Sequence, residues 1–145
     1  NIGNHILQTP GYVVIVYEMI GETRIIPLDD RPHIQSGIDL WMGDSRGHWD
    51  GDTLVVDSTH FNGLTWLDAA GNFHSDALHV VERYTPTSPF HIEYEVSIED
   101  PKVFTRAWTM RMPLYRRLED RLQLLDYDCV DFILQSLTSP EGGAR

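Results

Sequence analysis

The strongest hairpin signature in this chain is Arg46-Gly-His-Trp-Asp-Gly-Asp-Thr-Leu-Val-Val-Asp-Ser-Thr59. The dipeptide Asp50-Gly51 is typical of a tight turn, because both residue types tolerate the unusual backbone angles of a short hairpin loop. The β-branched run from Thr53 to Thr59 favours an extended strand. We therefore expect two antiparallel strands here, joined near Asp50-Gly51.

Strand patterns continue on both sides of this hairpin. Upstream, Tyr12–Met19 and Thr23–Ile26 are rich in β-branched residues and flank a turn, which predicts a second hairpin. Two long connections, 28–44 and 60–76, carry no sustained period and are expected to cover part of the sheet. Downstream, short turns separate four segments of an expected antiparallel meander, at Leu78–Thr85, His91–Ile98, Val103–Met112 and Arg121–Asp128.

These patterns predict one mostly β domain. About eight strands with one apolar side must close or pack as two sheets, because an open sheet of that size leaves long unpaired edges. An antiparallel, lipocalin-like (calycin-type) β-barrel is preferred to a sandwich. Apolar residues at helical spacing in Val130–Leu137 predict a short C-terminal helix. We expect the domain to span residues 1–138 and a disordered tail to follow at 139–145.

The composition excludes several classes of partner. The formal net charge is −11 and no basic cluster exceeds Arg116-Arg117, so neither nucleic acid nor a membrane surface is expected as a partner. No apolar run approaches the roughly 18 residues of a membrane span. No nucleotide-binding fingerprint is present, so no cofactor is expected. The lone Cys129 cannot form an internal disulfide, and localisation is left unassigned.

Between Trp41 and Arg83 the sequence resembles a family of uncharacterised bacterial proteins. The resemblance extends more weakly over Leu7–Glu18 and Glu93–Trp108, and so covers most of the chain. Members occur in acidobacteria and related soil bacteria, are often secreted, and usually carry an additional N-terminal region. The motifs that carry the resemblance are Trp41-Met42-Gly43, the hairpin quoted above, Phe61-Asn62, Thr65-Trp66-Leu67-Asp68, His74-Ser75, Ala77-Leu78-His79-Val80 and Glu82-Arg83.

The resemblance implies a fold and no assured activity. Gly47-x-Trp49 at the start of a strand is also similar to the signature of the lipocalin superfamily, which implies a lipocalin-like barrel. His48 and His60 depart from the family pattern, so the resemblance assigns no role to either histidine.

The connection from His60 to His79 is chemically dense, with three histidines and two aspartates within twenty positions. If it folds over a barrel mouth, Asp68 would orient His74 and raise its basicity, making His74 a general base near neutral pH. Trp66 would form an apolar wall and Asn62 would orient a carbonyl or hydroxyl group. The alternative is structural: Asp68, Asn62 and Ser75 cap turns, and His74 bonds to the backbone.

Two other kinds of site are weaker hypotheses for the same segment. His74 and His79, with Asp76 or His60, offer ligands that suit a divalent metal, but their spacing matches no strong metal motif. A serine hydrolase centred on Ser75 lacks the usual Gly-x-Ser-x-Gly elbow. No metal is therefore expected.

Five charged residues lie in predicted strands that otherwise look buried, namely Glu18, Arg24, Glu82, Arg83 and Arg106. Glu82 lies among apolar neighbours in one predicted strand, and Arg106 shares the apolar face of another with Trp108. An internal Glu82–Arg106 ion pair lining a cavity would satisfy both charges. In the alternative, slight bulges turn both side chains outward.

Together these features favour a cofactor-independent lyase, isomerase or cyclase that transfers protons on a hydrophobic or aromatic small molecule. His74 is the expected acid/base and Asp68 its orienting partner. A non-catalytic, lipocalin-like binding protein is the first alternative and a protein-interaction module the second; a homodimer is left open. The residues expected to contact the substrate are Tyr17, Trp41, Asn62, Trp66, His79, Glu82, Arg106 and Trp108.

Overall fold

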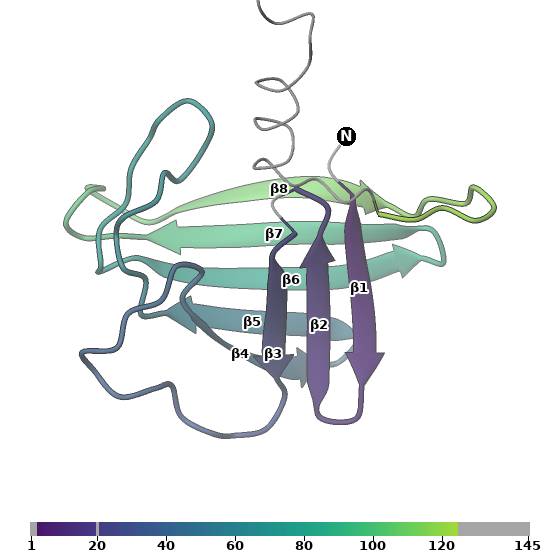
Figure 1. The fold of residues 1–145 in the computed structure, drawn as a ribbon, viewed down its shortest axis with the longest axis horizontal. Coiled ribbons are helices and arrows are strands. Elements are labelled where there is room, and N and C mark those ends of the chain that lie inside the picture. Colours follow the sequence, from purple (N-terminus) through teal and green to yellow (C-terminus); the bar gives the residue numbers. More distant parts are fainter. Residues whose placement is uncertain (1–2, 20, 125–145) are drawn as a thin grey trace, which may run out of the picture.

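The computed structural model describes residues 3–19 and 21–124, which form eight β-strands in two antiparallel sheets (Figure 1). The smaller sheet has the strand order β1-β2-β3. Its strands are β1 (Asn4–Thr9), β2 (Tyr12–Tyr17) and β3 (Thr23–Pro27). The predicted upstream hairpin is confirmed as β2 and β3, and β1 is a further strand that the sequence pattern did not predict.

The larger sheet is a meander with the order β4-β5-β6-β7-β8. Its first hairpin closes through Gly51 and Asp52, and Asp50 pairs with Thr53. Gly51 has a φ of 61°, which glycine adopts without strain at the first loop position of a tight hairpin. The strands are β4 (Asp44–Asp50), β5 (Thr53–Thr59), β6 (His79–Ser88), β7 (His91–Glu99) and β8 (Trp108–Tyr115).

The two sheets pack face to face, and in Figure 1 the strands of the smaller sheet run across those of the larger sheet. At Gly47 in β4, an added Cβ would lie 2.8 Å from Ile26 Cγ2 of β3, so glycine allows the sheets to approach closely there. Burial of apolar side chains from both sheets supplies the main stabilising term. The main core consists of Val13, Ile15, Ile26, Leu54, Val56 and Tyr84.

The mostly β, antiparallel fold is confirmed, with sheets of three and five strands in the described residues. No backbone ladder joins the two sheets in the described part of the chain, so a closed barrel is not confirmed. Residues 3–19 and 21–124 contain no helix, and hence none that could span a bilayer. The helix predicted at Val130–Leu137 and the tail predicted at 139–145 lie outside the described residues.

The end of the meander differs from the prediction. The strand expected at 103–112 begins only at Trp108, because the chain first turns after Pro101. The amides of Val103 and Phe104 both donate to the carbonyl of Asp100, at 3.0 and 2.7 Å, which holds them out of the sheet. Of the strand expected at 121–128, residues 121–124 form no strand and the others lie outside the described residues.

The two long connections, 28–43 and 60–78, lie at the same end of the larger sheet (Figure 1). A parallel bridge joins Leu40 to Phe61, and the amide of Leu40 donates to the carbonyl of His60 at 2.8 Å. Beneath the second connection lies a smaller core of Leu78, Val96 and Ile98. Both connections are therefore anchored to the sheet, and they bring polar side chains together at this end.

Candidate functional site

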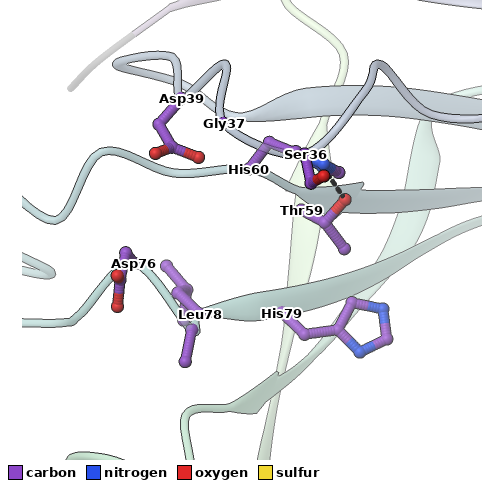
Figure 2. A pocket seen from close by; sticks show the side chains of 9 residues that line it. Ser36, Gly37, Asp39, Thr59, His60, Asp76, Leu78 and His79 are labelled. Atoms are coloured by element: carbon purple, nitrogen blue, oxygen red, sulfur yellow. Dashed lines mark hydrogen bonds between the residues drawn. The ribbon is translucent and has the colours of Figure 1, made fainter.

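A pocket of about 280 Å³ opens where the two connections meet the larger sheet. Figure 2 shows residues 36–39 and 59–60 on one side of it and residues 76–79 on the other. Six of its nine lining residues have polar side chains. The lining residues are Ser36, Gly37, Asp39, Thr59, His60, Asp76, Ala77, Leu78 and His79.

Beside this pocket, the Asp57 carboxylate of β5 binds two imidazole rings, one through each oxygen. His79 Nε2 lies 2.8 Å from Asp57 Oδ2, and His33 Nε2 lies 3.0 Å from Asp57 Oδ1. A carboxylate only accepts hydrogen bonds, so Nε2 of His79 carries the ring proton and donates it. Asp57 therefore fixes the orientation and the tautomer of His79.

His33 connects this pair to a second acid. Its Nδ1 lies 2.8 Å from Asp44 Oδ2, so the His33 ring bridges the carboxylates of Asp44 and Asp57. The His60 ring stacks on His33 with 6.0 Å between centroids, and His60 Nδ1 lies 2.8 Å from Thr59 Oγ1. We call His33, Asp44, Asp57, His60 and His79 the histidine cluster.

Hydrogen bonds keep Asp44 ionised within this cluster. Burial raises the pKa of its carboxyl, but hydrogen bonds from the Ile34 amide, His33 and Arg46 outweigh burial, so the pKa lies below the usual value. Arg46 Nη1 is 2.6 Å from Asp44 Oδ1. The anionic Asp44 holds His33, and through it the connection that carries Ser36 and Asp39, against the larger sheet.

His74, the predicted base, has a different environment. It is only 4% exposed, its Nε2 lies 2.7 Å from Thr65 Oγ1, and its Nδ1 lies 3.0 Å from the carbonyl of Ser75. The Phe61 ring packs edge-on against it. Both ring nitrogens are thus used within the connection, which confirms the structural alternative for His74.

The predicted pairing of Asp68 with His74 is wrong. Asp68 Oδ1 accepts hydrogen bonds from the amides of Ala70 and Asn72, and Oδ2 accepts one from the Asn72 side chain. A short acidic side chain that meets amides two and four residues ahead is satisfied by its own turn. Those hydrogen bonds lower the pKa of Asp68, and the one from Asn72 Nδ2 contributes most to the lowering.

The acid that anchors the 60–78 connection is Asp100, which the sequence did not indicate. Asp100 is 1% exposed and accepts hydrogen bonds from the Ser75 amide (2.6 Å), Ser75 Oγ (2.8 Å) and the Lys102 amide (3.1 Å). Burial raises its pKa, but these donors outweigh burial and lower it overall. Asp100 thus fastens residue 75, one position before the pocket residue Asp76, to the end of β7.

Asp100→Asn should therefore destabilise the protein, because the amide would turn an NH₂ group toward N–H and O–H donors. We expect a loss of about 1.5–3 kcal/mol in the free energy of unfolding at neutral pH. A lowered carboxyl pKa stabilises the folded state above the unfolded pKa of about 3.9, and that stability disappears as the pH falls through the folded pKa. Urea unfolding at neutral and at strongly acidic pH would check this: the difference between variant and wild type should vanish in acid, and an equal difference at both pH values would contradict it.

Glu82 points inward, which is one of the two orientations that the sequence left open, but its proposed partner Arg106 is exposed in the turn before β8. The actual partner is Arg24 of β3, whose Nη2 contacts Glu82 Oε2 across the two sheets. Arg106 would lie on the apolar strand face only if the strand began at residue 103. Because of the turn held by Asp100, β8 begins at Trp108, and Arg106 lies outside the strand. The proposed Glu82–Arg106 pair is therefore wrong.

The Arg24–Glu82 pair lies in a fully hydrogen-bonded interior. Tyr84 and Tyr94 donate to Glu82 Oε1 at 2.8 and 2.9 Å, and Arg24 also donates to Ser45 and Ser58. Burial, followed by the Glu82 charge, raises the pKa of both tyrosines. No buried side-chain polar atom of the described residues lacks a partner. The hydrogen bonds of this group involve none of the pocket-lining residues, and they join the two sheets.

The other residues expected to contact substrate are dispersed. Trp41 and Trp66 are exposed, the latter by 74%. Asn62 accepts a hydrogen bond from the Leu64 amide, as the structural alternative predicted. Tyr17 and Trp108 pack against the main and the smaller core, respectively. Of the predicted set, only His79 lines the pocket described above.

Sequence reasoning missed His33, Asp44 and Asp57. The signal for Asp57 was its place in an apolar strand, on the face opposite Leu54 and Val56. In the described ranges, no group of three His, Cys, Asp or Glu is arranged to hold a metal ion. Comparison of the chain with family models, curated proteins and solved structures finds no match. The family resemblance stays a prediction.

Proposed function

We propose that the chain is a cofactor-independent enzyme that transfers protons on a small molecule, with His79 as the acid/base. The observation that carries this proposal is the 2.8 Å contact between His79 Nε2 and Asp57 Oδ2 at the edge of the pocket. A histidine whose tautomer is fixed by a carboxylate, and whose ring reaches solvent, is the usual form of a general base.

His79 meets these conditions better than His74 does. Its side chain is 38% exposed, and its Nδ1 makes no hydrogen bond to any described residue. With the proton held on Nε2 by Asp57, Nδ1 presents a lone pair that can accept a proton from a substrate. His60 lies in the same lining with only its Nδ1 engaged, and could bind or protonate a second substrate atom.

The lining favours a substrate with polar groups over the hydrophobic or aromatic molecule predicted from the sequence. Ser36, Asp39, Asp76 and the two histidines offer hydrogen bonds, whereas Ala77 and Leu78 supply the apolar contact. The lipocalin-like barrel likewise stays a prediction.

Asp57→Asn tests the proposal. The probe is nitrobenzisoxazole: a base removes its carbon-bound proton, the N–O bond breaks, and a coloured cyanophenolate is released. Loss of a hydrogen bond to a charged group is equivalent to about 1.5–3 kcal/mol, so turnover should fall about 10–100-fold. The matched control is Asp50→Asn, which alters an exposed acid of β4.

Three outcomes are informative. A fall in turnover for Asp57→Asn alone supports the proposal. Equal turnover by wild type and both variants contradicts it. Saturable binding of the probe without turnover would favour the alternative of a binding protein that leaves its ligand unchanged.

A further inference from the structure

Each sheet has two edge strands, and the four differ in the residues that block pairing with another chain. An open edge presents unpaired backbone groups to other chains, and proteins usually block it with charges or proline. In this chain β3 carries Arg24 and Pro27, and β8 carries Arg111 and Pro113. The fourth edge, β4, carries acidic residues and Arg46.

The edge strand β1 has none of these features. Its sequence, Asn4-His5-Ile6-Leu7-Gln8-Thr9, contains no Lys, Arg, Asp, Glu or Pro, and all six residues are exposed. It pairs with β2 in continuous register and without a bulge, so its outer edge is regular. Of the edges in the described residues, β1 is thus the one suited to accept another strand.

An apolar row leads to this edge on the outer face of the smaller sheet. Leu7 pairs with Val14, and Val14 pairs with Ile25, so the three side chains lie side by side across β1, β2 and β3. Leu7 is 41% exposed and Ile25 is 61% exposed. A strand added at β1 with an apolar residue opposite Leu7 would extend this row.

We propose that β1 is a self-association edge, at which β1 of a second copy pairs antiparallel about a two-fold axis through Leu7. The strand is complementary to itself in this arrangement: Leu7 faces Leu7, Ile6 faces Gln8, and His5 faces Thr9 of the second copy. The apolar row then runs unbroken across six strands, and the contact closes after one pairing.

Among the possible approaches of a second copy, the charge distribution favours this edge. The chain has a net charge of −11, so two copies repel each other over most approaches. Since β1 carries no acidic residue, repulsion is weakest where the backbone groups are available. An uncharged strand such as β1 of a second copy therefore meets the least repulsion here.

Light scattering after size-exclusion chromatography tests this inference on the whole chain. Wild type should elute with twice the 16.7 kDa mass of the chain, and Leu7→Lys should halve that mass because two lysines would face each other across the axis. Ile25→Lys is the matched control. Ile25 lies in the same apolar row but on β3, two strands away from the β1 edge, so the Ile25→Lys variant should keep the doubled mass.

The thermal transition of Leu7→Lys shows whether this variant folds. If it does not, a second measurement tests the proposal. Leu7→Cys in a Cys129→Ser background should form a covalent dimer under mild oxidation, whereas Ile25→Cys in that background should not. A monomeric wild type at all concentrations, dissociation by Ile25→Lys as well, or equal cross-linking at both positions would overturn the proposal.

Discussion

Glu82→Gln is expected to lower the free energy of unfolding by about 3–5 kcal/mol, because it leaves the buried guanidinium of Arg24 without its counter-charge. Arg24 cannot escape by losing its proton. Burial lowers its pKa, but the Glu82 charge and hydrogen bond outweigh burial and raise it above the ordinary value. Glutamine matches glutamate in shape, so the loss reports the charge and not a cavity.

The control for this prediction is a second ion pair involving the same strand. Arg83 of β6 binds Asp50 Oδ2 at 2.7 Å, but both side chains are more than a third exposed. Exposed pairs contribute about 0–1 kcal/mol, so Asp50→Asn should change stability little. Chemical denaturation of both variants gives the comparison. If Glu82→Gln is no more destabilising than Asp50→Asn, the buried pair does not join the sheets energetically.

His79→Gln is expected to lower turnover of the nitrobenzisoxazole probe by about 10²–10⁴-fold, the usual contribution of a positioned general base. Glutamine retains a hydrogen-bonding group near Asp57 but has no lone pair of suitable basicity. The folded state should be little affected, because His79 is partly exposed and belongs to no core cluster. The measurement is the initial rate of phenolate release, with the thermal transition recorded in parallel.

Two further variants separate His79 from the other histidines. His48→Gln alters an exposed histidine of β4 and should leave the rate unchanged. His74→Gln removes the predicted base; because His74 serves the 60–78 connection, the variant should affect stability more than the rate constant. A rate loss in His74→Gln equal to that in His79→Gln, with both proteins folded, would move the base back to His74.

Much of the fold could be predicted because its signals are local. The run from Thr53 to Thr59 forms β5 with the predicted bounds, and His91 to Ile98 places Val96 and Ile98 in the core as its alternation indicated. β1 was missed because Asn4–Thr9 does not alternate between apolar and polar residues. The late start of β8 depends on hydrogen bonds to Asp100, which no periodicity reveals.

The candidate site could be predicted only in part. The chemical density of the 60–79 segment directed attention to His79, and its position among apolar residues directed attention to Glu82. The partners of both come from distant strands: Asp57 is 22 positions from His79, and Arg24 is 58 positions from Glu82. Asp68 and His74, which are close in sequence, are each satisfied within the connection.

By itself the sequence determined most of the strand segments and the tight hairpin turn, and it marked Glu82 as a charge on an apolar strand face, since steric preference, turn geometry and side-chain alternation act over a few residues. The tertiary structure decided which charges meet. The register that sets Asp57 opposite Val81 places it diagonally across from His79, and the packing of β3 over the larger sheet brings Arg24 to Glu82. A carboxylate binds whichever donor the fold brings within about 3 Å, and that distance is not encoded in local pattern.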